Sequence, residues 1–282
     1  MDPRHDYEPI PPPPVTQDEL TAGLRQIGLG RGDLVVAHVS LSSLGRVEGG
    51  AGAVVDALLA AVGPEGTLLL PRFSTYFDLG GVYDRRRPPP TWTGRVSDCL
   101  VRRPDAILSL HPSHAVVAVG PQAHAVTAGH DRVSPLGVDS PFDRMAQRGG
   151  RVLLVGVNQR VNTTIHTGEA HARVAYWGKP RPDRPQGLWS LDELGNRRWV
   201  RLSELPGDSY AFVGVEPFLA ARGLIASGRI GRASIRLMPG KELIAAVVEF
   251  LRQDPGGLLC HRPGCSFCNW ARQWLSAPPT AH

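Results

Sequence analysis

The chain reads VLLVGV at residues 152–157 and NTTIHTGE at residues 162–169, and these two stretches decide the predicted fold. A run of branched apolar residues that ends in glycine is typical of a buried parallel strand. Asn162 can then cap a helix that we expect to begin at Thr163. A buried strand followed directly by a helix indicates an α/β protein.

His166 and Glu169 lie three positions apart on that predicted helix, so both side chains face the same side. Glu169 can orient the imidazole or stabilise its charged form. The positive end of the helix dipole opposes protonation of His166 and favours a neutral imidazole that accepts a proton. These residues alone are compatible with two interpretations, a general base or a histidine that packs beneath the strand.

The composition is that of a globular protein, with 42% hydrophobic and 20% charged residues over 282 positions. The formal net charge of +5 comes from 31 basic and 26 acidic residues, and the arginines are scattered without a continuous basic stripe. We therefore expect no nucleic-acid partner, although a phosphate-bearing small molecule is compatible with this charge.

Residues 1–16 contain several prolines and no apolar core of a signal peptide. We predict a flexible tail at 1–16 and one domain at 17–282. No stretch approaches the roughly 20 apolar residues of a membrane span, and four cysteines do not indicate a disulfide framework. These features predict a cytoplasmic protein with no membrane partner.

A polar loop follows a second predicted strand, at residues 33–39. The strand breaks into Ser40-Leu41-Ser42-Ser43, and glycines then introduce a helix from about Ala53 to Val62. Backbone N–H groups and hydroxyls in such a loop can hold a phosphate, but an ordinary polar turn is the alternative. The chain has neither a P-loop nor a dinucleotide-binding fingerprint.

Residues 66–71 predict another short strand, which we expect to end at Pro71 because proline cannot donate to a ladder. The long loop that follows would lie at the carboxyl end of the strand, where open α/β sheets bind ligands. Further on, His111 and His114 precede the strand pattern of residues 115–119. These histidines could ligate a metal, contact a phosphate or lie at the surface.

Several stretches together resemble, in consistent order, the aminoglycoside 3-N-acetyltransferases: residues 33–45, 47–50, 63–68, 111–112, 140–141 and 162–169. The similarity extends from about Thr21 to the C-terminus. It implies a three-layer α/β/α fold, acetyl-coenzyme A as cosubstrate and the 3-amino group of an aminoglycoside as acceptor. A small antiparallel excursion around residues 199–202 would be an addition to this fold.

The resemblance implies roles for individual residues. His166 would be the base of a direct acyl transfer without a covalent enzyme intermediate, with Glu169 as its partner. Ser74 or a nearby backbone N–H is our hypothesis for the donor to the tetrahedral oxyanion. The residues that would contact coenzyme A or lie beside its channel are Ser40, Leu41, Ser42, Ser43, His111 and Ser140.

The sequence departs from the family pattern at three positions. Arg72 stands where a threonine often follows the proline of the second strand, and Thr167 and Gly168 replace an apolar residue and an alanine. We expect these departures to lie near the acceptor or the base and to affect the choice of substrate.

Cysteines gather near the C-terminus as Cys260-His261-x-x-x-Cys265-x-x-Cys268. The spacing of Cys265 and Cys268 lets two thiolates meet one zinc ion. A redox pair and unliganded thiols are the alternatives. Members of the resembled family that accept apramycin are similar here, and this resemblance implies Asp78 as a further metal ligand.

Two other functions remain open at this point. The first is acetylation of a different amine in natural-product biosynthesis. The second is a zinc-dependent hydrolase that uses His111, His114 and the cysteines around an open metal position. A non-catalytic binding protein is disfavoured by the His-x-x-Glu pair. A cationic acceptor would need carboxylates, for which the candidates are Asp78, Asp84, Asp183, Asp192 and Glu193.

Overall fold

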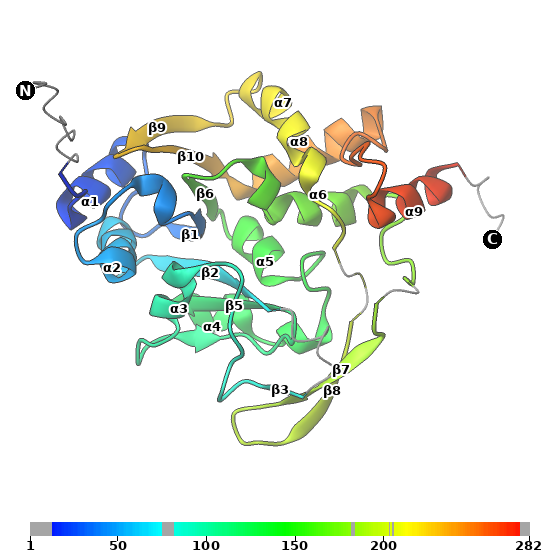
Figure 1. Ribbon diagram of the computed structural model, residues 1–282, viewed down its shortest axis with the longest axis horizontal. Coiled ribbons are helices and arrows are strands. Elements are labelled where there is room, and N and C mark those ends of the chain that lie inside the picture. The colour runs from blue at the N-terminus through cyan, green and yellow to red at the C-terminus, as the bar shows by residue number, and fades with distance from the viewer. Residues whose placement is uncertain (1–12, 75–81, 182–183, 203, 205, 277–282) are drawn as a thin grey trace, which may run out of the picture.

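The structure is a computed structural model that describes residues 13–74, 82–181, 184–202, 204 and 206–276. A seven-stranded sheet with the order β4-β5-β2-β1-β6-β10-β9 runs through its centre (Figure 1). The strands β2, β1 and β6 are parallel, and β5 and β10 flank them in antiparallel pairing. The strands of this sheet are β1 (Leu34–Val39), β2 (Thr67–Phe73), β4 (Ile107–Leu108), β5 (His114–Val119), β6 (Arg151–Val155), β9 (Ala226–Ile230) and β10 (Ala233–Pro239).

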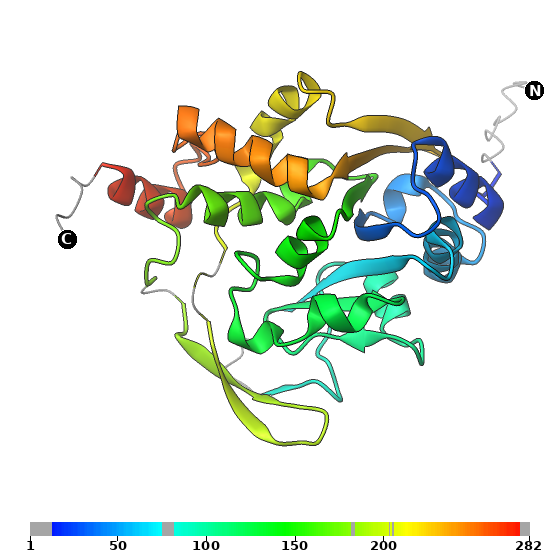
Figure 2. The same cartoon turned by 180° about the vertical axis from the view of Figure 1, so that it is seen from behind.

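Helices cover both faces of the sheet, as the two views show (Figures 1 and 2). The first layer contains α1 (Gln17–Gln26), α2 (Gly50–Val62) and α3 (Arg95–Leu100). The other contains α4 (Ala123–Thr127), α5 (Pro141–Gln147), α6 (Thr164–Ala172), α7 (Glu216–Ala220), α8 (Gly240–Gln253) and α9 (Ser266–Leu275). The predicted three-layer α/β/α fold is confirmed.

The alternation of side chains along each strand explains why there are two apolar cores. Val36 and Val152 face the core beneath α5, α6 and α8, whereas their neighbours Val35 and Leu153 face the core beneath α1 and α2. Successive residues of a strand point to opposite faces, so a strand that is apolar throughout must be covered on both sides. All four residues are at most 1% exposed.

A second, three-stranded sheet projects from the body of the molecule (Figure 1). It consists of β3 (Tyr83–Asp84), β7 (Gly187–Leu191) and β8 (Arg197–Arg201), with β7 and β8 antiparallel and β3 parallel to β7. This is the predicted antiparallel excursion. Because β3 lies about a hundred residues before β7, its addition to the pair could not be deduced from local pattern.

The prediction that Pro71 ends its strand is wrong, since β2 continues to Phe73. Beyond Leu69, β2 pairs only with β5, because the register with β1 ends at Val36 and Leu69. Proline is tolerated where the edge that would need its N–H has no partner strand. The strand therefore extends further toward the cavity than the sequence suggests.

The start of the described chain is packed against the domain. Val15 is buried and forms a parallel bridge with Val47, and Thr16 caps α1 in a capping box with Glu19. We predicted a flexible tail up to Thr16, but Val15 and Thr16 belong to the folded domain. Residues 1–12 lie outside the described residues. None of the described helices is long and apolar enough to cross a bilayer.

Candidate active site

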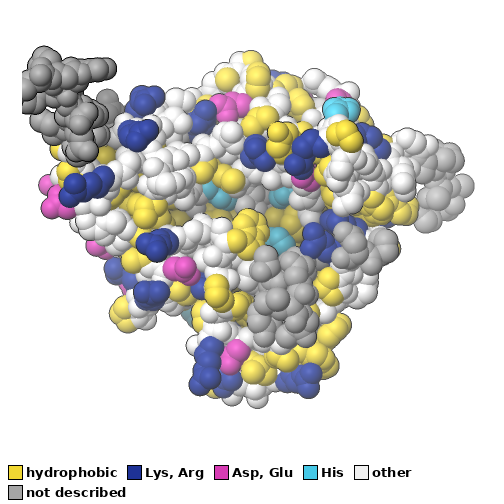
Figure 3. All heavy atoms as spheres, in the orientation of Figure 1, with side chains coloured by type: hydrophobic (Ala, Val, Ile, Leu, Met, Phe, Trp, Pro, Cys, Tyr) yellow, Lys and Arg dark blue, Asp and Glu magenta, His cyan; other side chains and the backbone are white. Residues whose placement is uncertain are grey.

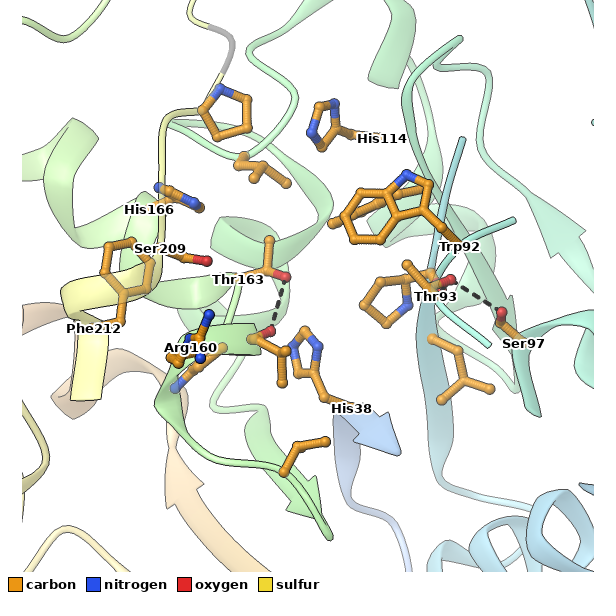
Figure 4. A pocket seen from close by; sticks show the side chains of 18 of the residues that line it. His38, Trp92, Thr93, Ser97, His114, Arg160, Thr163, His166, Ser209 and Phe212 are labelled. Atoms are coloured by element: carbon orange, nitrogen blue, oxygen red, sulfur yellow. Dashed lines mark hydrogen bonds between the residues drawn. The ribbon is translucent and has the colours of Figure 1, made fainter. Parts of the chain in front are cut away.

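A cavity of about 540 Å³ opens at the carboxyl ends of β1, β2 and β6, where α/β sheets place their ligands. Histidine side chains are visible in the hollow at the centre of the face in Figure 3. His38 comes from β1, His114 from the start of β5 and His166 from α6. Figure 4 shows His166 and His114 on different sides of this space, with Ser209 and Phe212 next to His166.

The predicted pair of His166 and Glu169 is present on α6 and is buried. The Nδ1 atom of His166 lies 2.5 Å from Oε2 of Glu169. The other carboxylate oxygen accepts a hydrogen bond of 2.6 Å from the hydroxyl of Tyr176. Burial and the neighbouring Glu169 raise the pKa of Tyr176 well above its usual value, so the phenol remains a donor. Tyr176 was not predicted, because it lies beyond the end of α6.

The start of α6 holds the imidazole in place. The helix begins at Thr164, one residue later than predicted, and Oδ1 of Asn162 accepts a hydrogen bond from the backbone N–H of Thr164. The ring of Phe212 meets the His166 ring edge-on, with centroids 4.7 Å apart. His166 therefore has Nε2 as its only ring nitrogen without a hydrogen bond to a described residue.

The departures at Thr167 and Gly168 directly follow His166 on α6, and neither residue is among those that line the cavity. Their effect on the choice of substrate stays a prediction. Both residues are buried, and the hydroxyl of Thr167 donates to the carbonyl of Leu136 at 2.7 Å. A Cβ atom at Gly168 would meet Cγ1 of Val247 at 2.4 Å. The absence of a side chain at Gly168 is what lets α6 lie close against α8.

Replacing Gly168 with alanine should lower the free energy of unfolding by about 1–2 kcal/mol, because overpacking against Val247 outweighs the gain in helix propensity. The measurement is chemical denaturation of a double-mutant cycle with Val247→Ala. In the Val247→Ala background the loss caused by Gly168→Ala should be smaller, because Cγ1 of residue 247 is removed, but not zero, because its Cβ still lies 2.6 Å from the added methyl position. An equal loss in both backgrounds would show that the contact with Val247 is not the cause.

Arg72, the third departure, is buried and holds two segments beside the cavity. It donates to the carbonyl of Pro89 at 2.9 Å and pairs with Asp98 of α3 at 3.0 Å. Thr93 of the intervening segment donates to the carbonyl of Pro71 and lines the cavity. The guanidinium thus positions a wall of the cavity and is itself absent from the lining.

Two further predicted site residues have structural roles instead. Ser140 is fully buried and caps α5 by accepting from the N–H of Asp143. His111 is buried outside the lining, and its Nδ1 accepts hydrogen bonds from the backbone N–H groups of Ser113 and His114. Burial lowers the pKa of His111 well below its usual value. His114, and not His111, reaches the cavity.

Ser74 lines the cavity, but its donors are already engaged. Its hydroxyl donates to the carbonyl of Pro112 at 2.9 Å, and its backbone N–H donates to the carbonyl of Ser113 at 2.9 Å. The hypothesis that Ser74 supplies the oxyanion donor therefore conflicts with this arrangement. Neither donor is available without breaking an existing hydrogen bond.

The predicted phosphate-binding loop follows β1 and contains a short helical turn, η1 (Ser42–Leu44). Its three serine hydroxyls are linked, since Ser43 donates to Ser40 at 2.8 Å and Ser42 lies 3.3 Å from Ser40. A Cβ at Gly156 would meet Cβ of Ser43 at 2.4 Å, so the loop packs against the end of β6. The loop lies beside the cavity and does not contribute to the lining.

The cysteines near the C-terminus form a cluster with an acidic residue. One ligand atom from each of Asp208, Cys260, Cys265 and Cys268 lies within 4.8 Å of every other. The three thiols are buried, and none of them forms a disulfide bond. Asp78, the predicted acidic ligand, lies outside the described residues. His111 and His114 are not part of this cluster, so the structure does not support the hydrolase site predicted from these histidines and the cysteines.

The predicted acceptor carboxylates on the small sheet are paired with arginines. Asp84 pairs with Arg86, Asp192 with Arg198 and Glu193 with Arg85. None of these three acids lines the cavity, whose described lining contains Arg160 and Arg184. Asp78 and Asp183 lie outside the described residues.

Comparisons with known proteins agree on one family. A sequence model described as aminoglycoside 3-N-acetyltransferase matches residues 36–252. The aminoglycoside N(3)-acetyltransferase VIII of Streptomyces fradiae is 33% identical over 278 residues, which cover 86% of this chain and 94% of that protein.

Solved structures show the same similarity. A mutant of aminoglycoside acetyltransferase AAC(3)-IVa in complex with a gentamicin has a TM-score of 0.82 and 31% identity, covering 94% of this chain and 99% of that one. A binary complex of AAC-IIIb with CoASH has a TM-score of 0.74 and 26% identity, covering 84% and 96%. Each of these two structures has the same fold as this chain over most of the length of both.

Proposed function

Because the chain belongs to the aminoglycoside 3-N-acetyltransferase family, we propose that it transfers the acetyl group of acetyl-coenzyme A to the 3-amino group of an aminoglycoside. The observation that carries this proposal is the buried array of His166, Glu169 and Tyr176 at the cavity. One edge of the imidazole is fixed by a carboxylate, and the other is left for a substrate proton. A histidine that served packing alone would not need this arrangement.

In the proposed reaction, Nδ1–H of His166 donates to Glu169, which leaves Nε2 as the acceptor. The amine nitrogen attacks the thioester carbon while Nε2 removes its proton. The nitrogen–carbon bond forms, the carbon–sulfur bond breaks, and the proton passes to the departing thiolate. Glu169 stabilises the transient imidazolium, and the hydrogen bond from Tyr176 keeps the carboxylate in place.

We place coenzyme A across the carboxyl ends of the strands, with its phosphates near Ser40, Leu41, Ser42 and Ser43. Support comes from the linked hydroxyls of this loop and from its position directly after β1, whose last residues line the cavity. A solved relative binds CoASH. We infer that the protein acts in the cytoplasm, where acetyl-coenzyme A is available.

A thiol-release assay with acetyl-coenzyme A tests the function. Gentamicin belongs in the panel because a solved relative binds it, and apramycin because another structure of AAC(3)-IVa, with a TM-score of 0.77 and 28% identity, contains it. Thiol release with at least one aminoglycoside, and acetylation at the 3-amino group by mass spectrometry and NMR, are expected. No release with any aminoglycoside would overturn the proposal.

A second candidate is acetylation of a less charged amine in natural-product biosynthesis. It is favoured by one observation: among the described residues, the cavity lining contains Arg160 and Arg184 and no carboxylate. Arginines repel a polycationic acceptor. Simple amines in the same panel distinguish the two candidates, since only the second expects them to react better than aminoglycosides.

Salt should weaken the aminoglycoside reaction. If carboxylates such as Asp78 or Asp183 bind the cationic drug, its apparent KM should rise several-fold between about 20 mM and 500 mM salt, because exposed charge pairs are screened. Steady-state kinetics at saturating acetyl-coenzyme A measure this change. A singly charged amine is the control and should show a smaller rise. An equal dependence for both acceptors would contradict carboxylate recognition.

We further propose that Asp208, Cys260, Cys265 and Cys268 bind one zinc ion. The donor set fits, because zinc prefers four tetrahedral ligands and combines thiolates with carboxylates. Tetrahedral thiolates around zinc lie about 3.8 Å apart, and the four ligand atoms are already within 4.8 Å of one another. Bound zinc would cross-link the loop before α9 and the first turn of α9 to the segment that contains Asp208.

This cross-link would brace a wall of the cavity. Ser209 lines the cavity, and Phe212 packs against His166. Tyr210 follows Ser209 in the chain, and two guanidinium groups pack against its ring. The Cζ atoms of Arg160 and Arg262 lie 4.0 Å and 4.1 Å from the ring centroid. Arg262 in turn pairs with Asp208 at 2.6 Å. The role we assign to the metal is therefore structural, and no step of the reaction involves it.

A further inference from the structure

We propose that His114 donates a hydrogen bond from Nε2–H to the carbonyl oxygen of the acetyl thioester and stabilises the negative charge that develops there. This inference rests on the proposed function, since it assigns a residue to that reaction. It is independent of the base, because His166 handles the proton of the amine and His114 the charge on the oxygen.

The reaction needs such a donor. When the amine attacks, the carbonyl oxygen becomes an oxyanion, and a donor already in position lowers the energy of this state. The donors of Ser74 are used by Pro112 and Ser113. His114 lines the same cavity as His166, and Figure 4 shows the two rings on different sides of the space where the thioester would lie.

The hydrogen bonds around Ser113 assign the tautomer of His114. The Ser113 hydroxyl lies 2.8 Å from Nδ1 of His114 and 3.5 Å from Nδ1 of His111. The His111 nitrogen already accepts two backbone N–H groups, so it is a poor acceptor for the hydroxyl hydrogen. We therefore assign Ser113 as the donor to Nδ1 of His114, which places the proton of that ring on Nε2.

The Nε2 atom of His114 has no hydrogen-bond partner among the described residues, although the opposite edge of the ring is fixed by Ser113. Phe73 packs against the ring with centroids 4.7 Å apart. A donor without a protein partner that lines a cavity is suited to a substrate oxygen. Ser113 is then a positioning residue, because it acts through the tautomer and orientation of His114.

The imidazole also stays neutral over the working pH range. Burial, together with the nearby His166, His130 and Arg184, lowers the pKa of His114 to about 3. A neutral imidazole can still donate one hydrogen bond, and it does not compete with His166 for protons. Burial lowers the pKa of His38 to about 3 as well, but no hydrogen bond assigns its tautomer and its Nε2 is buried without a partner among the described residues.

Kinetics of two His114 variants test the proposal. His114→Leu should lower kcat by about 10²–10³-fold, the loss typical of one oxyanion donor, with the KM for acetyl-coenzyme A within about threefold of wild type. His114→Gln keeps an N–H near the position of Nε2 and should retain most of the activity. The pH profile should keep its shape in both variants, because His114 does not titrate near neutral pH.

His124→Leu is the matched control, since His124 is an exposed histidine on α4 and should give wild-type kinetics. A folded His114→Leu enzyme with kcat within threefold of wild type would overturn the proposal. So would equal losses in the leucine and glutamine variants, because these would indicate packing rather than donation. If wild-type enzyme acetylates no amine at all, the proposed function fails instead.

A measurement that does not depend on activity addresses the tautomer. The ¹⁵N and ¹H shifts of the His114 ring should show the neutral Nε2–H form from pH 5 to pH 8, and Ser113→Ala should give a mixture of tautomers. An Nδ1–H form or a protonated ring in wild-type protein within this range would overturn the assignment.

Discussion

Replacing His166 with alanine is expected to lower kcat by roughly a hundredfold or more, the usual loss for a general base, while the affinity for coenzyme A changes little. An ammonium has no lone pair, so attack on the thioester requires removal of a proton. Nε2 of His166 is the ring nitrogen left for that proton, because Nδ1 is engaged by Glu169. Steady-state kinetics, with coenzyme A binding measured by calorimetry, give both quantities.

Glu169→Gln provides the graded comparison, since it keeps the shape of the side chain and removes its charge. We expect a milder loss than in His166→Ala. Near-normal turnover of the His166 variant at neutral pH would eliminate the proposed base. His124→Ala, on the exposed side of α4, controls for the effect of losing an unrelated histidine.

The central part of the fold could be predicted because its signals are local. The β6 strand is a continuous apolar run, and α6 begins within one residue of the predicted position. The pairing of His166 with Glu169 follows from helical spacing alone, so it needs no knowledge of the tertiary fold. The small antiparallel sheet was also visible, as alternation around Trp199 and Val200.

The rest of the site depends on contacts between distant segments. Tyr176 completes the array at His166 only because the chain turns after α6, and no spacing rule identifies such a residue. His111 and His114 are equivalent in the sequence, yet only His114 reaches the cavity. The hydrogen bonds that hold the His111 ring away from the cavity come from the backbone N–H groups of Ser113 and His114. The residue types alone do not specify this backbone geometry.

The cluster of Asp208 and the three thiols, for which we propose zinc, combines both kinds of information. The Cys265 and Cys268 pair was predicted from its spacing, and Cys260 was recognised as a nearby thiol without being assigned. Asp208 lies about fifty residues earlier in the chain and is brought to the thiols by the segment that precedes η5 (Tyr210–Val215). An acidic residue in a polar loop has no local feature that marks it as a ligand.

Changing Cys265 and Cys268 together to serine should abolish bound zinc, which we expect at about one ion per chain in wild-type protein. The melting temperature should fall by roughly 10 °C, because a tightly bound structural ion contributes several kcal/mol to a domain of this size. Elemental analysis and calorimetry measure these two effects. Cys99→Ser is the matched control, since Cys99 is a thiol of α3 outside the cluster.

The segments that lose protection from hydrogen exchange in the double variant test whether the zinc site stabilises the wall of the cavity. Hydrogen exchange should accelerate in the double variant at residues 208–212 and 260–268, while β1 and β6 keep their protection. Turnover should fall with it, because Phe212 would no longer hold the His166 ring from the side of η5. Metal-free wild-type protein with full activity would end the zinc proposal. Zinc retained by the double variant would show that the ion is bound elsewhere, and unchanged exchange at 208–212 would remove the link between cluster and cavity.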